Sequence, residues 1–401
     1  MFCQFSFQNF RSYRSETTLD FQAAALPEFR ETLIASEHAS DLLPVSVVYG
    51  PNGGGKSNLL AALACVISMV VSPVLQLGKT RRTFVLQQKI PVVPFLFDDV
   101  SRGEPTEFRL FFRENNNEYG YYLAWKDGVI CAESLYRKAL RGKKPAMIFE
   151  REDDAIELGY SIRKQSINRS VNPKMPYLSF LAINYNIPAI TEAMQWFEGC
   201  IIQSYARPSA GAALSFLENA DEKKALTEAL NDMDIDITDL WLDEQSHRLY
   251  TTRRIGASSY ELSFDEESAG TQKLITVLPV LLLALSEGRM VIIDELDAKL
   301  HPKLLRYVIS MFQNPAVNQH GAQLLFTSHD MYTMKNTVFR RDEIWFAAEN
   351  AAHESELYSL YEIRGEDHQR IKNTAAYDKQ YMEGRYGADP YLSNLLGGDF
   401  V

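Results

Sequence analysis

The sequence is poor in the features that mark secreted, metal-stapled and membrane-bound proteins. It has four cysteines in 401 residues, and no two of them form a CxxC pair. This spacing argues against a zinc knuckle and a disulfide framework, and we expect reduced, mostly buried thiols. The N-terminus, MFCQFSFQNFRSYRSE, has neither the basic start nor the apolar core of a signal peptide. The cysteines are Cys3, Cys65, Cys131 and Cys200.

Long apolar runs and positive charge are also scarce. Two runs, LLAALACVISMVVSPVLQL and LITVLPVLLLAL, raise a membrane interpretation, but Pro73 interrupts the first and the second is too short to span a bilayer without strain. We expect buried helices of a soluble cytoplasmic protein with no membrane partner. The net charge of -11 argues against a uniformly basic surface wrapped by nucleic acid, although a local basic patch is compatible with it.

The strongest positive signal is the segment PVSVVYGPNGGGKSNLL, which contains the pattern GxxxxGKS between a strand pattern and a helical one. Its glycines let backbone N–H groups surround an anion, and the following helix points its positive end at the phosphates. Lys56 can reach the β- and γ-phosphates, and the Ser57 hydroxyl can bind Mg²⁺. We therefore predict a site for ATP and Mg²⁺. Its cofactor-binding residues are Gly50, Asn52, Gly53, Gly54, Gly55, Lys56, Ser57 and Asn58.

A second motif, GRMVIIDELDAKLHP, supplies the acidic groups that ATP hydrolysis requires. Its apolar start is typical of a short, buried parallel strand. Asp294 at the end of this strand would hold the metal, and Glu295 would act as the base or position the attacking water. Alone, such a sequence is also compatible with a surface turn. Together with a phosphate loop, it indicates a nucleotide hydrolase.

A third apolar strand, within AQLLFTSHDMYTM, ends at Ser328 and His329. We expect it to pair beside the Asp294 strand, at the sheet edge where ligands collect in open α/β sheets. His329 can then donate a hydrogen bond to the γ-phosphate; a structural or solvated histidine is the alternative. The predicted catalytic residues are thus Glu295, His329 and Lys56, and the predicted metal ligands are Ser57 and Asp294.

These pieces in this order, with SAGTQ before the acidic strand, resemble the ATP-binding-cassette (ABC) class of ATPases. More narrowly, they resemble its non-transporter branch, which includes RecF, the chromosome-maintenance ATPases and the overcoming-lysogenisation-defect (OLD) proteins. FSFQNFRSYRSETTLDF resembles the opening strand pair of that branch, in which the NFRS turn approaches the nucleotide. DELDAKLHP is similar to the OLD-type form, with Asp297 at the D-loop position before His301 and Pro302. The tail RRDEIWFAAENAAHESELYSLYEIR resembles stand-alone AAA-type ATPases of bacterial anti-phage and abortive-infection systems.

In that class two ATPases enclose two nucleotides, each bound by the phosphate loop of one subunit and the signature of the other. The resemblance therefore implies a homodimer or higher homo-oligomer, with Ser268, Gly270 and Asp297 as further cofactor-binding residues. Ala269 replaces the first glycine of the usual Ser-Gly-Gly-Gln, which is a mild departure. An ordinary helix N-cap at Ser268 is the alternative. The class also has a Q-loop glutamine, and nothing in the local pattern decides between Gln87 and Gln88.

The resemblance implies an α/β fold, in which an ABC-type P-loop NTPase core with a mixed central sheet and flanking helices carries an antiparallel β subdomain and a helical lid subdomain. The breaks at Asn115-Asn116-Asn117 and Asp127-Gly128 predict β-hairpins, and the apolar spacing after Tyr177 is helical. We divide the chain into an N-terminal ATPase lobe with the phosphate loop (1–80), an antiparallel β subdomain or insertion with a basic segment (81–175), a helical lid region (176–262), an ATPase lobe with signature, acidic strand and histidine (263–345), and a C-terminal family-specific tail (346–401).

Two functions fit this sequence. The first is an ATP-hydrolysing switch that dimerises and controls a separately encoded effector, such as a nuclease or toxin, in anti-phage defence. The alternative is a RecF-like recombination or repair ATPase that binds nucleic acid through the basic region near Arg141, Lys143 and Lys144. Basic runs of this kind are more often solvated faces. A transporter subunit fits less well, because the chain lacks membrane spans.

Overall fold

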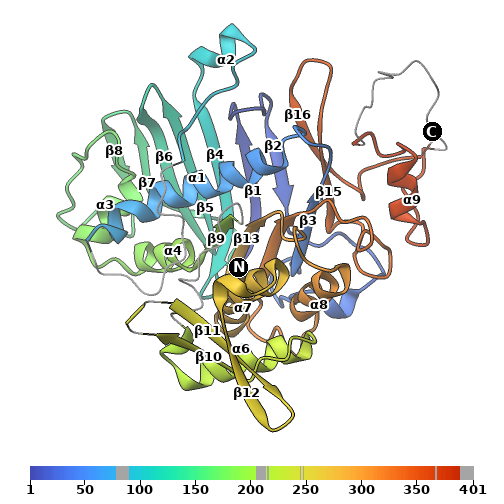
Figure 1. The fold of residues 1–401 in the computed structure, drawn as a ribbon. Helices are drawn as coiled ribbons and strands as arrows, with labels where there is room; N and C mark the ends of the chain where they lie inside the picture. The colour runs from blue at the N-terminus through green and yellow to red at the C-terminus, as the bar shows by residue number, and fades with distance from the viewer. Residues whose placement is uncertain are drawn as a thin grey trace.

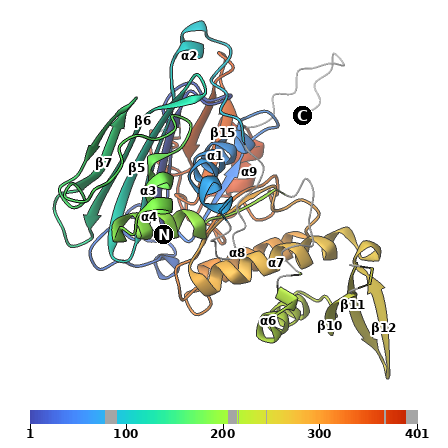
Figure 2. The same cartoon turned by 90° about the vertical axis from the view of Figure 1, so that its left-hand side faces the viewer.

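The computed structural model describes residues 1–77, 90–204, 214, 216–243, 245–246, 248–365 and 368–388. Two large sheets, with the long helix α1 (Lys56–Leu75) packed between them, organise this part of the chain (Figure 1). A small third sheet projects from one side, together with α6 (Ala220–Asp232) (Figure 2).

The six-stranded sheet carries the sequence motifs. Its strand order is β16-β15-β3-β14-β13-β9, and all neighbouring strands are parallel except β15 and β16. β3 and β14 are buried at every position, as expected for strands covered on both faces. The carboxyl ends of the parallel strands meet at one edge, where the predicted motifs follow. The strands are β3 (Val45–Tyr49), β9 (Ile201–Ser204), β13 (Met290–Asp294), β14 (Gln323–Thr327), β15 (Ile344–Glu349) and β16 (Ser355–Ser359).

The seven-stranded sheet is antiparallel throughout, in the order β2-β1-β4-β5-β6-β7-β8. The two predicted hairpins are confirmed: Asn115 and Asn116 join β4 to β5, and Asp127-Gly128 joins β5 to β6, all with positive φ. β1 and β2 complete this sheet from the N-terminus. The strands are β1 (Phe2–Gln8), β2 (Thr17–Asp20), β4 (Thr106–Glu114), β5 (Asn117–Lys126), β6 (Val129–Ala139), β7 (Ala146–Glu152) and β8 (Ala155–Leu158).

The two apolar runs of the sequence form the long helices α1 and α7 (Ala269–Glu287). Both are long and apolar enough to cross a membrane by length and composition, but 61% and 67% of their most apolar windows are buried inside the protein. The structure corrects one detail, since Pro73 does not interrupt α1, which continues to Leu75. Pro73 has no N–H to donate to the carbonyl four residues earlier, and the helix ends two residues after it. Other helices of the described residues are α2 (Asp99–Gly103), α8 (Pro302–Gln313) and α9 (Tyr377–Met382), and there are two 3-10 turns, Arg30–Thr32 and Phe264–Glu266.

The structure divides residues 176–262 differently from the expected helical lid. Helices α3 (Tyr177–Asn184) and α4 (Pro188–Gly199) pack against α1 and, in the case of α4, against β4, because their buried apolar side chains join the same core as α1. β9 enters the central sheet beside β13. The projecting part therefore consists of α6, which packs on α7, and of a three-stranded sheet (Figure 2). Its strands are β10 (Asp239–Asp243), β11 (Arg248–Ile255) and β12 (Ser258–Ser263).

A buried carboxylate joins the antiparallel sheet to α3. Glu133 on β6 is fully buried and accepts hydrogen bonds from the first amides of α3, from Tyr177 N at 2.6 Å and Leu178 N at 3.0 Å, and from the Tyr121 hydroxyl at 3.0 Å. Arg151 on β7 lies 3.9 Å away. Burial raises the pKa of Glu133, while the two amides oppose that rise. Because Pro176 at the N-cap makes no side-chain cap, Glu133 caps this helix from a distant part of the chain.

We expect Glu133→Ala to lower the free energy of unfolding by about 3–5 kcal/mol, because it leaves a buried arginine and two helix amides without their carboxylate. Urea unfolding followed by circular dichroism measures this. Glu157→Ala on the exposed side of β8 is the matched control, with an expected change of less than about 0.5 kcal/mol. Equal midpoints for the two variants would show that Glu133 is not a cap.

Candidate functional site

The phosphate loop is shaped by β15 and β16 as much as by its own sequence. A Cβ on Gly50 would lie 2.0 Å from the Ala347 carbonyl oxygen, and one on Gly54 would lie 2.5 Å from the same atom. Gly55 has φ 104° and faces the Ser355 hydroxyl. Larger residues cannot occupy these positions, because β15 and β16 pack directly against the loop. The glycine at the N-cap also brings no side chain to the first amides of α1, which suits an anion site.

Lys56 is folded back onto the loop that precedes it. Its Nζ donates to the carbonyl oxygens of Gly50 at 2.8 Å and Pro51 at 2.9 Å. Burial lowers the pKa of Lys56, and the carboxylates of Asp294, Glu295 and Asp297 oppose that shift. Because β14 pairs with both β3 and β13, motifs 238 positions or more apart in the sequence follow neighbouring strands and share one site.

The acidic strand ends in a turn that Thr327 holds in place. The Thr327 hydroxyl donates to Asp294 Oδ1 at 2.6 Å and accepts from the backbone N–H of Glu295 at 2.7 Å. Glu295 adopts φ 53°, a left-handed conformation that is unusual for a residue with a side chain, and its side chain is exposed. No role for Thr327 was predicted from the sequence. The feature that could have indicated one is its position at the end of β14, the parallel neighbour of β13.

The predicted histidine and the D-loop aspartate are brought together as well. The backbone N–H of His329 donates to Asp297 Oδ2 at 3.0 Å, and the His329 ring is exposed. Asp297 Oδ1 is a buried oxygen without a hydrogen-bond partner in the structure. Such an acceptor suits a site that receives a further donor group.

The residues present fit ATP and Mg²⁺. A glycine cradle, the first amides of α1 and Lys56 match a triphosphate. Ser57 and Asp294 offer hard oxygen ligands, and Mg²⁺ commonly takes only one or two from the protein and the rest from phosphates and water. No group of three or more histidine, cysteine or acidic residues that could hold a metal occurs among the described residues. Asn58 differs from the prediction in orientation, because its side chain donates to Ser12 Oγ at 2.8 Å and accepts from Arg11 at 3.3 Å.

The signature segment begins α7 beside the turn that carries Glu295. The Ser268 hydroxyl caps α7 by accepting from Thr271 N at 3.2 Å, so the helix-cap interpretation holds whatever else Ser268 does. Ser268 and Ala269 are exposed. A Cβ on Gly270 would lie 3.0 Å from the carbonyl oxygen of Lys299. The segment is thus packed close to its own D-loop while its tip faces outward.

Several residues that support the site were not predicted. Tyr13 of the NFRSYR turn donates to the Gly55 carbonyl oxygen at 3.3 Å, which places that turn against the phosphate loop. Glu267 binds Arg253 and Thr251 of β11, and Lys273 of α7 reaches the D-loop. Gln87 and Gln88 lie outside the described residues. Arg141, Lys143 and Lys144 lie in the exposed turn between β6 and β7.

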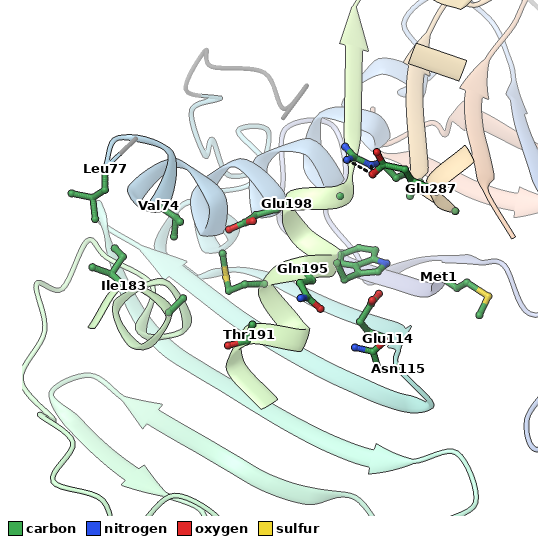
Figure 3. A pocket seen from close by; sticks show the side chains of 17 residues that line it. Met1, Val74, Leu77, Glu114, Asn115, Ile183, Thr191, Gln195, Glu198 and Glu287 are labelled. Atoms are coloured by element: carbon green, nitrogen blue, oxygen red, sulfur yellow. Dashed lines mark hydrogen bonds and ion pairs between the residues drawn. The ribbon is translucent and has the colours of Figure 1, made fainter. Parts of the chain in front are cut away.

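A cavity of about 730 Å³ lies elsewhere in the structure (Figure 3). Met290, the first residue of β13, lines it, whereas Asp294 is the last residue of that strand. The cavity is therefore at the opposite end of the sheet from the phosphate loop. Its lining includes Glu114, Glu198 and Glu287, and Arg289, which also lines the cavity, is paired with Glu287.

Comparison with known proteins places this site in a family. Residues 45–335 match the family model described as "AAA domain, putative AbiEii toxin, Type IV TA system". The chain belongs to this family. The match runs from β3 to just beyond His329 and so includes the phosphate loop, signature, acidic strand and histidine. A search of curated proteins finds no match.

Solved structures similar to this AAA domain include ATPase heads and cassettes. The head domain of the chromosome-maintenance protein SMC from Thermotoga maritima is 13% identical, with 89% of this chain and 98% of that chain covered and a TM-score of 0.42. An SMC head bound to the C-terminal winged-helix domain of ScpA is 12% identical, with 89% and 97% covered and a TM-score of 0.42. A dimeric ATP-binding cassette bound to ADP and Pi is 10% identical, with 90% and 100% covered and a TM-score of 0.32.

These observations confirm two expectations. The AAA domain has the expected α/β fold, with the phosphate loop leaving a central strand of a mostly parallel sheet beside an antiparallel β subdomain. Its family is an AAA family linked to toxin–antitoxin systems, which agrees with the resemblance to abortive-infection ATPases. All four cysteines are free thiols, and only Cys131 is partly exposed.

Proposed function

We propose that this AAA domain is an ATP-hydrolysing switch that dimerises through composite sites and controls a separately encoded nuclease or toxin in anti-phage defence. The observation that supports it most is the convergence of Lys56, Asp294, Glu295 and Asp297 at one sheet edge in a chain of this family. The family description mentions a toxin in a type IV system, which is the basis for placing the effector in such a pair.

The residues would share the chemistry as follows. Lys56 exchanges its two carbonyl partners for phosphate oxygens, and the amides of the loop and of α1 hold the remaining charge. Ser57 and Asp294 would hold Mg²⁺, which would neutralise charge on the phosphates. Glu295 orients the attacking water and accepts its proton, while Thr327 fixes the backbone from which Glu295 projects. His329 donates to the γ-phosphate from the neighbouring strand.

The switch follows from the half-site on each chain. One chain offers a phosphate loop and, separately, an exposed signature at Ser268 and Ala269. ATP held between two chains would bind them together, and its hydrolysis would release them. The described residues contain no group of three or more histidine, cysteine or acidic residues that could hold a metal, and we assign the toxic or nucleolytic step to a second protein.

Purified wild-type protein is expected to release phosphate from ATP in the presence of Mg²⁺, and Lys56→Ala to lose about 100-fold or more of this activity, since phosphoryl transfer depends mostly on positioning and charge. Lys164→Ala, at an exposed loop position, is the matched control. Co-expression with the neighbouring gene product then tests the switch, because growth should differ between wild type and Lys56→Ala. Equal phosphate release by both proteins would exclude the site, and equal growth would exclude effector control.

A further inference from the structure

The start of α7 is held in place by hydrogen bonds to two other segments of the chain. On one side Glu267, which is buried, receives Arg253 Nη2 at 2.9 Å and the Thr251 hydroxyl at 2.5 Å. On the other side Lys273, only 3% exposed, donates from Nζ to the carbonyl oxygens of Glu295 at 2.8 Å and Ala298 at 2.7 Å. The signature segment, residues 267–273, is therefore tied directly to the backbone of the catalytic turn, residues 295–299.

The catalytic turn has a shape that requires such support. Glu295 and Lys299, at its two ends, have φ values of 53° and 64°. A residue with a side chain is strained in this region of φ and persists there only where its surroundings impose it. Within the turn, Ala298 N donates to the Glu295 carbonyl oxygen at 3.2 Å. The Lys273 ammonium binds the two carbonyls that point inward, so it helps to impose the conformation from which the Glu295 side chain projects.

The Lys273 ammonium is buried and is held at two backbone carbonyl oxygens. Burial lowers the pKa of Lys273 to about 8, and the negative charges of Asp297 and Glu295 oppose that shift. A group that is costly to bury and binds backbone rather than solvent is suited to fixing geometry. Gly270 adds to the contact, since its position lies against the Lys299 carbonyl and leaves no room for a side chain without movement.

We propose that Lys273 is a positioning residue that couples the signature of each chain to the catalytic turn of the same chain. This inference rests on the proposed dimer. There, the signature of one chain contacts the ATP bound by its partner, whereas Glu295 serves the ATP bound by its own phosphate loop. The effect of ATP binding to the signature would therefore be transmitted through Lys273 to Glu295 of the same chain. The two sites of a dimer would then hydrolyse ATP together.

The test uses Lys273→Met, which keeps the length of the side chain and removes its charge, and Lys273→Arg, which keeps the charge. Lys224→Met is the matched control, because Lys224 lies on α6, which packs against α7, and is 73% exposed in a pair with Glu228 at 3.8 Å. For each protein, ATP affinity, turnover against ATP concentration, and thermal unfolding are measured.

We expect Lys273→Met to bind ATP within about twofold of wild type, because its phosphate loop is intact, but to turn it over at least about tenfold more slowly, the factor that corresponds to 1.4 kcal/mol. The dependence of rate on ATP concentration should change from sigmoidal to hyperbolic, and Lys273→Arg should restore much of both. A purely structural lysine would instead lower ATP affinity, turnover and the unfolding temperature together. That result, or wild-type turnover with unchanged cooperativity in Lys273→Met, would overturn the proposal.

A second readout separates this inference from the proposed function. Amide hydrogen exchange of residues 295–300 is followed with and without ATP in Glu295→Gln and in the double variant Glu295→Gln/Lys273→Met, neither of which needs to hydrolyse ATP. Protection on ATP binding that is lost in the double variant supports the coupling even if the wild-type protein shows no turnover. Equal protection in the two proteins refutes it even if turnover is robust.

Discussion

Glu295→Gln is expected to lose about 100-fold or more of the ATP turnover and to accumulate as an ATP-bound dimer, because removal of a general base costs about 10²–10⁴ in rate. Glutamine keeps the shape of the side chain but cannot accept the proton of the attacking water. The fold should be unaffected, since the Glu295 side chain is exposed and its backbone is held by Thr327 and Lys273. ATP affinity should also persist, because the phosphate loop is unchanged.

Phosphate release measures the first effect, and light scattering coupled to gel filtration, with and without ATP, measures the second. Glu152→Gln, at an exposed end of β7, controls for the loss of one negative charge. Wild-type turnover in Glu295→Gln would show that Glu295 is not the water-positioning group. If Glu295→Gln loses turnover but does not form a dimer when ATP is added, the catalytic role of Glu295 stands and the composite site is contradicted.

The parts of this site that depend on local spacing were predictable. GxxxxGKS and an apolar strand ending in Asp-Glu each occupy a few consecutive residues, so their chemistry can be recognised before any fold is known. The order of the motifs then indicated that their strands share a sheet, and the structure has β3 paired with β14 and β14 with β13.

The supporting contacts were not predictable, because each joins segments far apart in the chain. Thr327 bonds to residues more than thirty positions away, and Lys273 reaches carbonyls 22 and 25 positions away. The same holds for Ala347, whose carbonyl dictates Gly50, and for Glu133, whose buried carboxylate caps α3. A threonine, lysine, alanine or glutamate in a sequence carries no sign of such a partner.

The fold of residues 176–262 was misjudged for a related reason. Helical spacing identifies α4 and α6, which show similar apolar periodicity, and α3 is apolar around most of its circumference, but none of these patterns tells on which surface the helix packs. α3 and α4 join the core around α1, whereas α6 joins α7. The acidic segment NDMDIDITDLW connects α6 to β10 and forms no metal cluster among the described residues.

A mixing experiment tests the trans contact that the dimer requires. Ser268→Arg places a long cationic side chain at the exposed tip of the signature, so turnover and ATP-driven dimerisation should fall about 100-fold and ATP binding by the chain's own phosphate loop should persist. Lys56→Ala is inactive for the opposite reason, because its phosphate loop fails while its signature is intact. Neither variant alone can build one complete composite site.

When the two inactive proteins are mixed, a dimer of one chain of each has one site with both defects and one site with neither. Random pairing makes half of the dimers mixed, and each mixed dimer has one of two sites intact, so activity should rise to at most about a quarter of wild type in a twofold-symmetric dimer. The Lys273 coupling would lower that figure, because the intact site sits beside a defective one. The Ser268→Arg protein without the second variant is the control. Full turnover by Ser268→Arg alone would contradict the trans contact, because it would show that a chain hydrolyses its bound ATP without the signature of a partner.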